Sequence, residues 1–305
     1  MAVGKRELTV VSPALSPINR PRLTSVALLN FFRRWVLLYA GATIFFIIAV
    51  FLIYWMVITA FKKNDDLYNV HHFPLWFNSG ITFSHLDYLF SKTHFSQWLA
   101  NSYMIGAFTV AITLIAAVPA GYALARMNLP FSGPLSIGIF LTYLVPASLL
   151  FIPLSRVVAD LGLQNSIWAL IVVYPTFTIP FCTWLMMGFF KTVPIEIEEA
   201  AMIDGCGAGQ AIWHVMLPIS RAGILSVVIF AFTLAMQDFV YALTFISTSL
   251  SKPVTLGVVT DLVRGDVFYW GELMAGALIA GVPVAILYNF FLDEFISGIT
   301  AGAIK

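Results

Sequence analysis

The sequence predicts an all-α, polytopic membrane protein with six transmembrane helices, and two observations carry this prediction. The chain has 305 residues, of which 60% are hydrophobic and only 10% are charged, and its mean hydropathy is +0.91. Soluble domains carry about a quarter charged residues, so this composition excludes an ordinary soluble protein. Apolar runs of roughly 20 residues recur along the chain, and a helix needs that length to cross ~30 Å of hydrocarbon.

The chain begins with a polar segment, residues 1–34, which contains three prolines and six basic residues. This composition favours a flexible N-terminal tail, and residues 35–305 then form the transmembrane domain. The first apolar run, 36–61, is too long and too far from the N-terminus for a cleaved signal peptide, and we predict it to be the first span. A polar and aromatic stretch, 62–97, follows and is too mixed in character to cross a membrane.

Five further spans are predicted at residues 98–125, 135–158, 167–190, 224–245 and 273–291. A polar loop (191–222), a polar and aromatic segment (247–270) expected to be solvated, and a C-terminal tail (292–305) lie outside them. The third and fourth spans contain Pro146, Pro153, Pro175 and Pro180. Because proline removes a backbone donor, these residues either kink the helices, which we favour, or free carbonyl groups to line a cavity.

Positive residues in the segments between spans predict the orientation of the chain. With the N-terminus inside, ten Lys and Arg residues lie on the cytoplasmic side and six on the outer side. Arg33 and Arg34, directly before the first span, strengthen this bias. We therefore expect both termini and the loop 191–222 in the cytoplasm of the cell.

The loop contains the most informative stretch of the chain. Thr192 and Pro194 suit the first turn of a helix, and the acidic residues that follow lie where the helix dipole favours negative charge. Glycines from Gly205 onward interrupt this helix, and 211–217 is expected to form a second helical segment that Pro218 helps to end. Two short helices that meet at a glycine bend would form a compact knob between two spans.

Within this loop, Glu199-Ala200-Ala201, Gly205 and Val215-Met216-Leu217-Pro218 follow one another at fixed offsets. The pattern resembles the Glu-Ala-Ala (EAA) loop signature of binding-protein-dependent ABC importer permeases, with Val215 where that family has Ile. Ile203-Asp204-Gly205 resembles the carbohydrate branch of the family, the maltose/glycerol-phosphate type. A generic amphipathic loop helix is the alternative interpretation.

The resemblance implies a type I, maltose-like permease of the bacterial plasma (inner) membrane that forms half of the translocation pathway for a sugar or sugar derivative. It implies as partners a second homologous permease, two ATP-binding subunits that hold ATP and magnesium, and an extracytoplasmic solute-binding protein. The chain itself is then no enzyme and binds no cofactor. The residues implied to couple it to the ATPase are Glu199, Ala200, Ala201, Asp204, Gly205, Leu217 and Pro218.

The resemblance extends over nearly the whole chain after the tail, through the segments 98–102, 121–126, 184–190 and 297–305. One departure is Met236-Gln237-Asp238, where the family often has Trp-Asn followed by Glu or Asp. Substrate contacts known for the family therefore do not transfer directly to this segment.

Asp238 lies in the middle of the predicted fifth span, where an ionisable side chain costs about 2.5–3.5 kcal/mol on insertion scales. Gln237 adds hydrogen-bonding groups, and Tyr241, three residues on, would share a helical face with Asp238. This group suits a path for a polyhydroxylated substrate. Equally, Asp238 would serve as an interhelical hydrogen-bonding group that fixes packing.

Other chemistry is not indicated by the sequence. There is no Gly-x-x-x-x-Gly-Lys-Ser/Thr run for ATP, and the five histidines are interpreted as surface residues rather than as metal ligands. Cys182 and Cys206 fit neither a disulfide nor a zinc pattern, and a net charge of +1 argues against a nucleic-acid partner. A solitary secondary transporter or channel remains the alternative function, although no internal repeat or set of paired intramembrane charges supports it.

Overall fold

The computed structural model describes residues 25–127, 129–264 and 267–303. The chain divides into two units, residues 1–53 and 54–305. Helix α1 (Ser25–Phe61) begins in the first unit and ends in the second. The predicted tail up to residue 24 lies outside the described residues, and the rest of it already belongs to α1, including Arg33 and Arg34.

Within the described residues, four helical segments are long and apolar enough to cross a membrane: 32–61, 95–126, 167–192 and 270–292. Two bent pairs of helices, 132–143 with 147–160 and 208–219 with 221–237, raise the number to six if each pair is one span. The all-α polytopic fold is thereby confirmed. The positions of the spans agree with the prediction except for the fifth, because the second bent pair includes residues 208–219 of the predicted polar loop and ends at residue 237 instead of 245.

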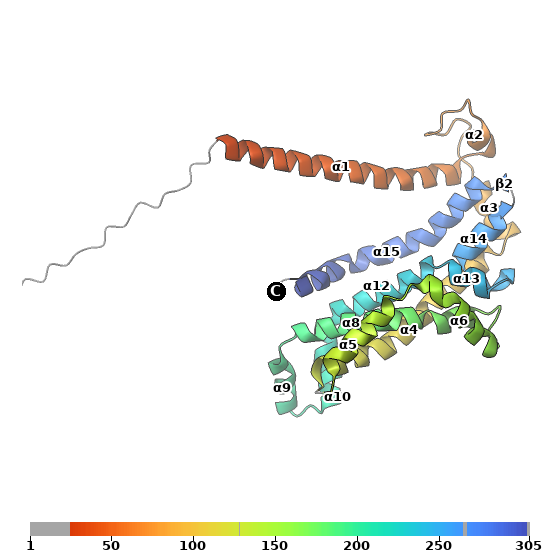
Figure 1. The fold of residues 1–305 in the computed structure, drawn as a ribbon. Helices are drawn as coiled ribbons and strands as arrows, with labels where there is room; N and C mark the ends of the chain where they lie inside the picture. The colour runs from red at the N-terminus through yellow and green to blue at the C-terminus, as the bar shows by residue number, and fades with distance from the viewer. Residues whose placement is uncertain (1–24, 128, 265–266, 304–305) are drawn as a thin grey trace, which may run out of the picture. The chain divides into compact units, whose positions relative to one another are not determined.

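Three helices form the central layer of the second unit (Figure 1): α4 (Phe95–Arg126) packs along α8 (Pro175–Thr192) and α12 (Arg221–Gln237). Glycines permit the close approach of these helices. A Cβ atom at Gly121 of α4 would lie 2.7 Å from the Cβ of Met186 on α8. Helix α5 (Ser132–Tyr143) covers α8, and α15 (Trp270–Ala303) packs on α12. The predicted C-terminal tail is not a separate segment, because α15 continues through it to Ala303.

The breaks in the predicted spans have different causes. The third span consists of α5 and α6 (Ala147–Asp160), which meet at 89° around Pro146. In the fourth span, α7 (Ile167–Val173) leads through Tyr174 into α8, which Pro175 begins. The predicted fifth span, 224–245, is not one helix: α12 ends at Gln237 and α13 (Val240–Phe245) follows after an extended Asp238. This correction separates Asp238 from any continuous helical face.

Shorter elements lie in the segments after α1 and after α13: α2 (Asn64–Tyr68), α3 (Ser84–Lys92), a 3₁₀ turn (Ser249–Ser251) and α14 (Val254–Leu262). A small antiparallel ribbon pairs β1 (Val263–Arg264) with β2 (Val267–Phe268), Val263 opposite Phe268. The segment 247–270 was expected to be solvated, but α14 buries Leu256 and Leu262. Gly257 lies so close to the buried Trp98 that a Cβ atom would come within 2.2 Å of its indole ring. Apolar residues at helical spacing in α14 explain this correction.

One histidine corrects the interpretation of all five as surface residues. His85 on α3 is only 1% exposed. Its Nδ1 lies 3.0 Å from a carboxylate oxygen of Glu272, and its Nε2 lies 2.7 Å from the carbonyl oxygen of Lys62. The hydrogen bond to Glu272 raises the pKa of His85 above its ordinary value, although burial acts in the opposite direction.

Candidate functional site

The loop between α8 and α12 folds as the predicted knob. Helix α9 (Ile195–Ile203) is followed by a turn at Gly205 and by α10 (Ala208–Ala211), a π-helical turn (Ile212–Met216) and α11 (Leu217–Ile219). Gly205 has a φ of 96°, a conformation that side chains disfavour. The predicted glycine bend is confirmed. The predicted ends shift, since Thr192 closes α8, Pro194 caps α9 and Pro218 lies inside the last short helix.

The outer face of the knob contains most of the residues that the sequence singled out. Five of these residues are exposed, namely Glu199, Ala200, Asp204, Gly205 and Pro218. The other two, Ala201 and Leu217, are half-buried. Two large apolar side chains on this face escaped the sequence reasoning: Ile203 is 85% exposed and Trp213 is 70% exposed. Their signal was the presence of bulky apolar residues in a polar loop, which is typical of an interaction surface.

The inner face of the knob is part of a hydrophobic cluster that joins it to the central layer. Val193 and Met216 are buried there together with Phe190 of α8 and Ala117 of α4. Residues of α12, among them Val227, complete the cluster. The knob is therefore packed onto the ends of α4, α8 and α12, while its opposite face stays open (Figure 1).

A buried polar contact reinforces this packing, and the sequence reasoning missed it. The hydroxyl of Tyr122 on α4 donates to a carboxylate oxygen of Glu198 on α9, and the Nε of Arg126 lies 3.4 Å from the other oxygen. Arg126 also donates to the carbonyl oxygen of Val193. The sequence placed Glu198 only near a helix N-terminus, because nothing in it shows that the end of α4 meets the first turns of α9.

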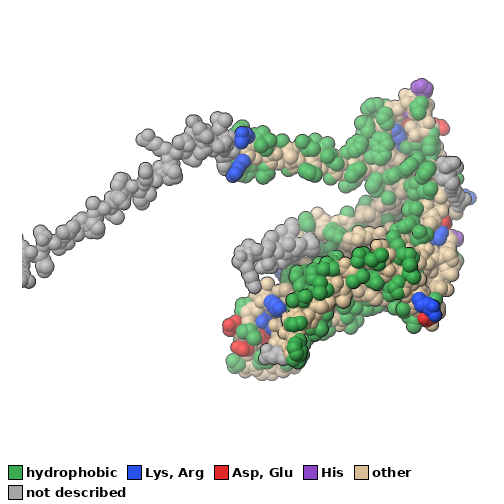
Figure 2. Space-filling view, viewed as in Figure 1, with side chains coloured by type: hydrophobic (Ala, Val, Ile, Leu, Met, Phe, Trp, Pro, Cys, Tyr) green, Lys and Arg blue, Asp and Glu red, His purple; other side chains and the backbone are tan. Residues whose placement is uncertain are grey.

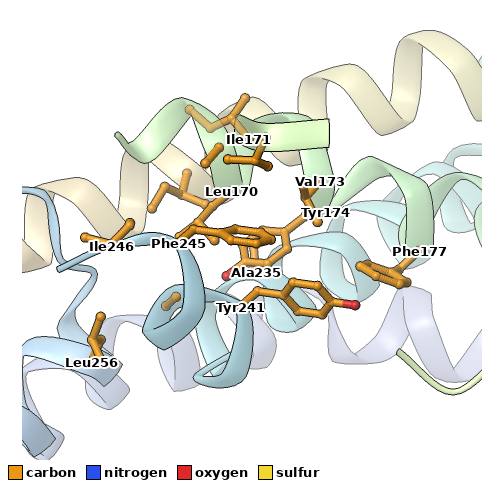
Figure 3. Packing of buried hydrophobic residues seen from close by; sticks show 14 residues of the cluster. Leu170, Ile171, Val173, Tyr174, Phe177, Ala235, Tyr241, Phe245, Ile246 and Leu256 are labelled. Carbon is orange, nitrogen blue, oxygen red and sulfur yellow. The ribbon is translucent and has the colours of Figure 1, made fainter. Parts of the chain in front are cut away.

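The second candidate site is a cavity of about 680 Å³ beside the break after Gln237. Its wall contains residues 143–147 at the bend between α5 and α6, Tyr174, Phe177, Leu234 and residues 237–241. The expectation that the prolines only kink the helices is therefore incomplete, because the bend at Pro146 supplies part of a cavity wall. Phe177 packs on the ring of Tyr241 with their centroids 5.2 Å apart (Figure 3).

All three residues predicted for a substrate path, Gln237, Asp238 and Tyr241, line this cavity. Asp238 Oδ2 accepts hydrogen bonds from the hydroxyl of Tyr174 at 2.9 Å and from the backbone N–H of Tyr241 at 3.1 Å. The carboxylate therefore caps the start of α13. Asp238 is therefore a packing group that also faces the cavity, and its role in a substrate path stays a prediction.

The distribution of charge agrees with a membrane protein. Figure 2 shows apolar side chains along the flanks of the helical layer, with acidic and basic groups gathered at the ends. Among the described residues, no group of three or more His, Cys, Asp or Glu side chains is arranged to hold a metal ion.

Membrane-spanning helices, a cavity at a helix break and a polar knob at one end define the membrane subunit of a transport system. Comparison with known proteins then identifies the family. Residues 117–300 match the family described as "Binding-protein-dependent transport system inner membrane component", and the chain belongs to this family of transporter permeases.

The relatives point the same way. The chain is 33% identical over 283 residues to the sulfoquinovosyl glycerol transport system permease protein SmoH of Agrobacterium fabrum. The aligned region covers 92% of this chain and 98% of the relative. The chain is also 32% identical over 265 residues to the diacetylchitobiose uptake system permease protein DasC of Streptomyces coelicolor. That aligned region covers 87% of this chain and 95% of the relative.

A solved structure shares the fold. A chain in the crystal structure of a bacterial ABC transporter involved in the import of the acidic polysaccharide alginate superimposes with a TM-score of 0.74 at 19% identity. The match covers 90% of this chain and 100% of the other.

Proposed function

We propose that this chain is a permease subunit of an ATP-driven ABC importer and forms half of the translocation pathway for a sugar or sugar derivative. The relatives named above support a carbohydrate or a glycosylated compound as substrate. A second homologous permease would complete the pathway. Two ATP-binding subunits would supply ATP and magnesium, and an extracytoplasmic solute-binding protein would deliver the substrate.

The knob is the observation on which the coupling part of this proposal rests. Its exposed outer face, with Glu199, Ile203 and Trp213, offers small, acidic and apolar groups to a partner protein. Its inner face is packed against α4, α8 and α12. When the ATPase pair closes, a push on the outer face would move these three helices together, because a close-packed interior transmits displacement.

The cavity beside Asp238 supports passage of a polyhydroxylated substrate. Aromatic side chains, among them Tyr143 and Phe177, supply flat apolar faces, and Gln237 and Asp238 supply hydrogen-bonding groups. A few polar groups set in a largely apolar wall are typical of small-molecule sites. The cavity would be completed by the second permease, and selectivity would be shared with the solute-binding protein.

Gly205→Asp tests the coupling role of the knob. The φ of 96° makes any side chain costly by about 1–2 kcal/mol, while open space around the glycine excludes a clash as the cause. We expect at least a tenfold loss of uptake, with the permease still in the membrane and the ATPase lost or unresponsive to the loaded binding protein. A bulky residue at the half-buried Ala201, as in Ala201→Trp, should have the same result.

Gly209→Asp is the matched control, since Gly209 is exposed, has open space around it and has no positive φ. It should retain uptake within about twofold of the native chain. Normal coupling in Gly205→Asp and Ala201→Trp would reject the knob as the ATPase contact. A solitary carrier would instead transport after purification without any ATPase.

The orientation, with both termini and the knob cytoplasmic, is part of the proposal. Val70 in the first outer loop is 91% exposed, and Ala208 on the knob is also exposed. In a chain with Cys182→Ala and Cys206→Ala, Val70→Cys should react with an impermeant thiol reagent in intact cells, and Ala208→Cys only in inverted vesicles. Reaction of both from outside would reject the orientation.

A further inference from the structure

We propose that Tyr122, Arg126 and Glu198 form a clamp that positions the knob on α4 and carries its displacement into the membrane. The inference rests on the proposed function, because it concerns how the knob acts once an ATPase moves it. These are positioning residues, since none of them faces the substrate cavity or the exposed face of the knob.

The connectivity of the chain leaves α4 without a covalent link to the knob. The knob is joined covalently to α8 and to α12, the helices on either side of it in the sequence. Helix α4 is joined to neither end of the knob. Its links to the knob are therefore non-covalent, and they consist of apolar packing in the shared cluster and of the polar contacts of Tyr122 and Arg126.

The clamp is formed by two side chains of α4 and one of α9. Tyr122 and Arg126 lie four residues apart, so they project from one face of α4 at its last turn. Each side chain contacts a different oxygen of the Glu198 carboxylate. Arg126 reaches in addition to the carbonyl oxygen of Val193, directly before α9. Two hydrogen bonds and one ion pair without a hydrogen bond therefore hold α9, and the residue before its N-cap, against α4.

The two charged side chains of the clamp are largely buried. Only 10% of the Arg126 side chain and 9% of the Glu198 side chain are exposed. Charges withdrawn from water interact strongly with one another and are poorly screened by salt. Sliding α9 away from α4 would leave both charges unpaired, which is unfavourable. The clamp therefore resists separation much more than an exposed ion pair would.

Helix α4 also makes polar contacts at its opposite end. There, Trp98 Nε1 donates to the carbonyl oxygen of Ser249 at 2.8 Å, and Asn101 Nδ2 donates to those of Leu250 and Lys252 at 2.8 and 3.0 Å. Both residues belong to the same helix as Tyr122 and Arg126. A displacement of the knob that reaches α4 through the clamp would therefore also move the outer segment around residues 249–252.

The test uses the complete transporter in nanodiscs, with its ATPase subunits and its substrate-loaded binding protein. We compare ATP hydrolysis with and without the binding protein, per assembled complex. Glu198→Gln and Glu198→Ala should keep the ATPase bound and basal hydrolysis within about twofold, but lower the stimulation at least fivefold. Glu196→Gln is the matched control, because Glu196 is an exposed carboxylate on the same helix, and its stimulation should stay normal.

Rescue separates positioning from simple stabilisation. The double variant Arg126→Glu with Glu198→Arg retains a pair of opposite charges and should regain at least half of the lost stimulation. Stimulation that stays normal per complex in Glu198→Gln and Glu198→Ala would overturn the proposal, even if less complex assembles. If the Glu198 variants do not assemble, Tyr122→Phe and Arg126→Lys decide the matter by the same criterion.

The outcome is distinct from failure of the proposed function. If Gly205→Asp uncouples the transporter but the clamp variants remain coupled, the knob contacts the ATPase and only the clamp is rejected. If Gly205→Asp and Ala201→Trp also couple normally, the proposed role of the knob itself is rejected.

Discussion

Glu198 in the knob and Asp238 at the helix break are both carboxylates that accept a hydrogen bond from a tyrosine far away in the sequence, Tyr122 on α4 and Tyr174 between α7 and α8. Their remaining partners differ. Glu198 faces the side chain of Arg126, whereas Asp238 accepts from the backbone N–H groups of Tyr241 and Ala242. The first carboxylate joins two elements that are far apart in the sequence, and the second mainly begins the next helix of its own segment. A hydrogen bond from a tyrosine therefore does not by itself tell what an acidic residue does.

The comparison predicts that Asp238 matters most for stability. Asp238→Leu removes the acceptor of the Tyr174 hydroxyl and of the first N–H groups of α13, and a buried donor left unpaired costs about 1–3 kcal/mol. We expect a loss of roughly 3 kcal/mol in total and a clear fall in thermal stability and membrane abundance. Asp238→Asn keeps one acceptor oxygen and should lose less than half as much.

Thermal unfolding of the detergent-solubilised complex measures this difference, and uptake at several substrate concentrations follows the role in the path. If Asp238→Leu unfolds at the temperature of the native protein, the carboxylate is no helix cap. If Asp238→Asn is stable but has an altered KM for uptake, the side chain also contacts substrate.

Tyr174→Phe should have a smaller effect. It deletes one hydroxyl and leaves the ring packed in the apolar cluster of α7, α8 and α13 (Figure 3). The hydrogen bond to Asp238 contributes about 1 kcal/mol, and the other donors to Asp238 remain. We expect a modest fall in thermal stability and unchanged stimulation of the ATPase per complex. A selective loss of stimulation would show that this region also takes part in coupling, against the comparison above.

The smallest effect concerns pH and another carboxylate, the buried Glu272, whose partner His85 titrates. Hydrogen bonding to Glu272 raises the pKa of His85 above its ordinary value of 6.5. The stability from this pair is therefore fully present below pH 6.5 and is lost as the pH rises through the higher pKa of the folded state. Stability measured between pH 6 and 9 should fall in the native chain and change less in His85→Gln. Equal slopes in the two chains would contradict this.

Several features could be predicted from the sequence because they depend on local chemistry. Long apolar runs placed the spans, and Gly205 marked a turn because few other residues adopt a positive φ. The offsets from Glu199 to Pro218 identified the knob, and the exposure of Glu199 and Asp204 followed from their position in a polar loop.

Other features depend on which elements meet, and the sequence does not contain that information in readable form. Glu198 and Glu199 are neighbours with the same chemistry, and only the position of α4 makes the first buried and the second exposed. His85 is buried because α3 packs against the start of α15. The break at Asp238 carries neither proline nor glycine, so no local signal distinguished it from a continuous helix.

The length of α12 has a consequence for the bilayer. Its 17 residues extend about 26 Å, which is less than the ~30 Å of hydrocarbon that a span must cross. Non-helical backbone at membrane depth persists only where protein or water satisfies its polar groups. Here Thr255 donates to the carbonyl oxygen of Asp238 at 3.0 Å. Helix α14 thus supplies a donor that lipid cannot, which keeps the shortened helix compatible with a bilayer of ordinary thickness.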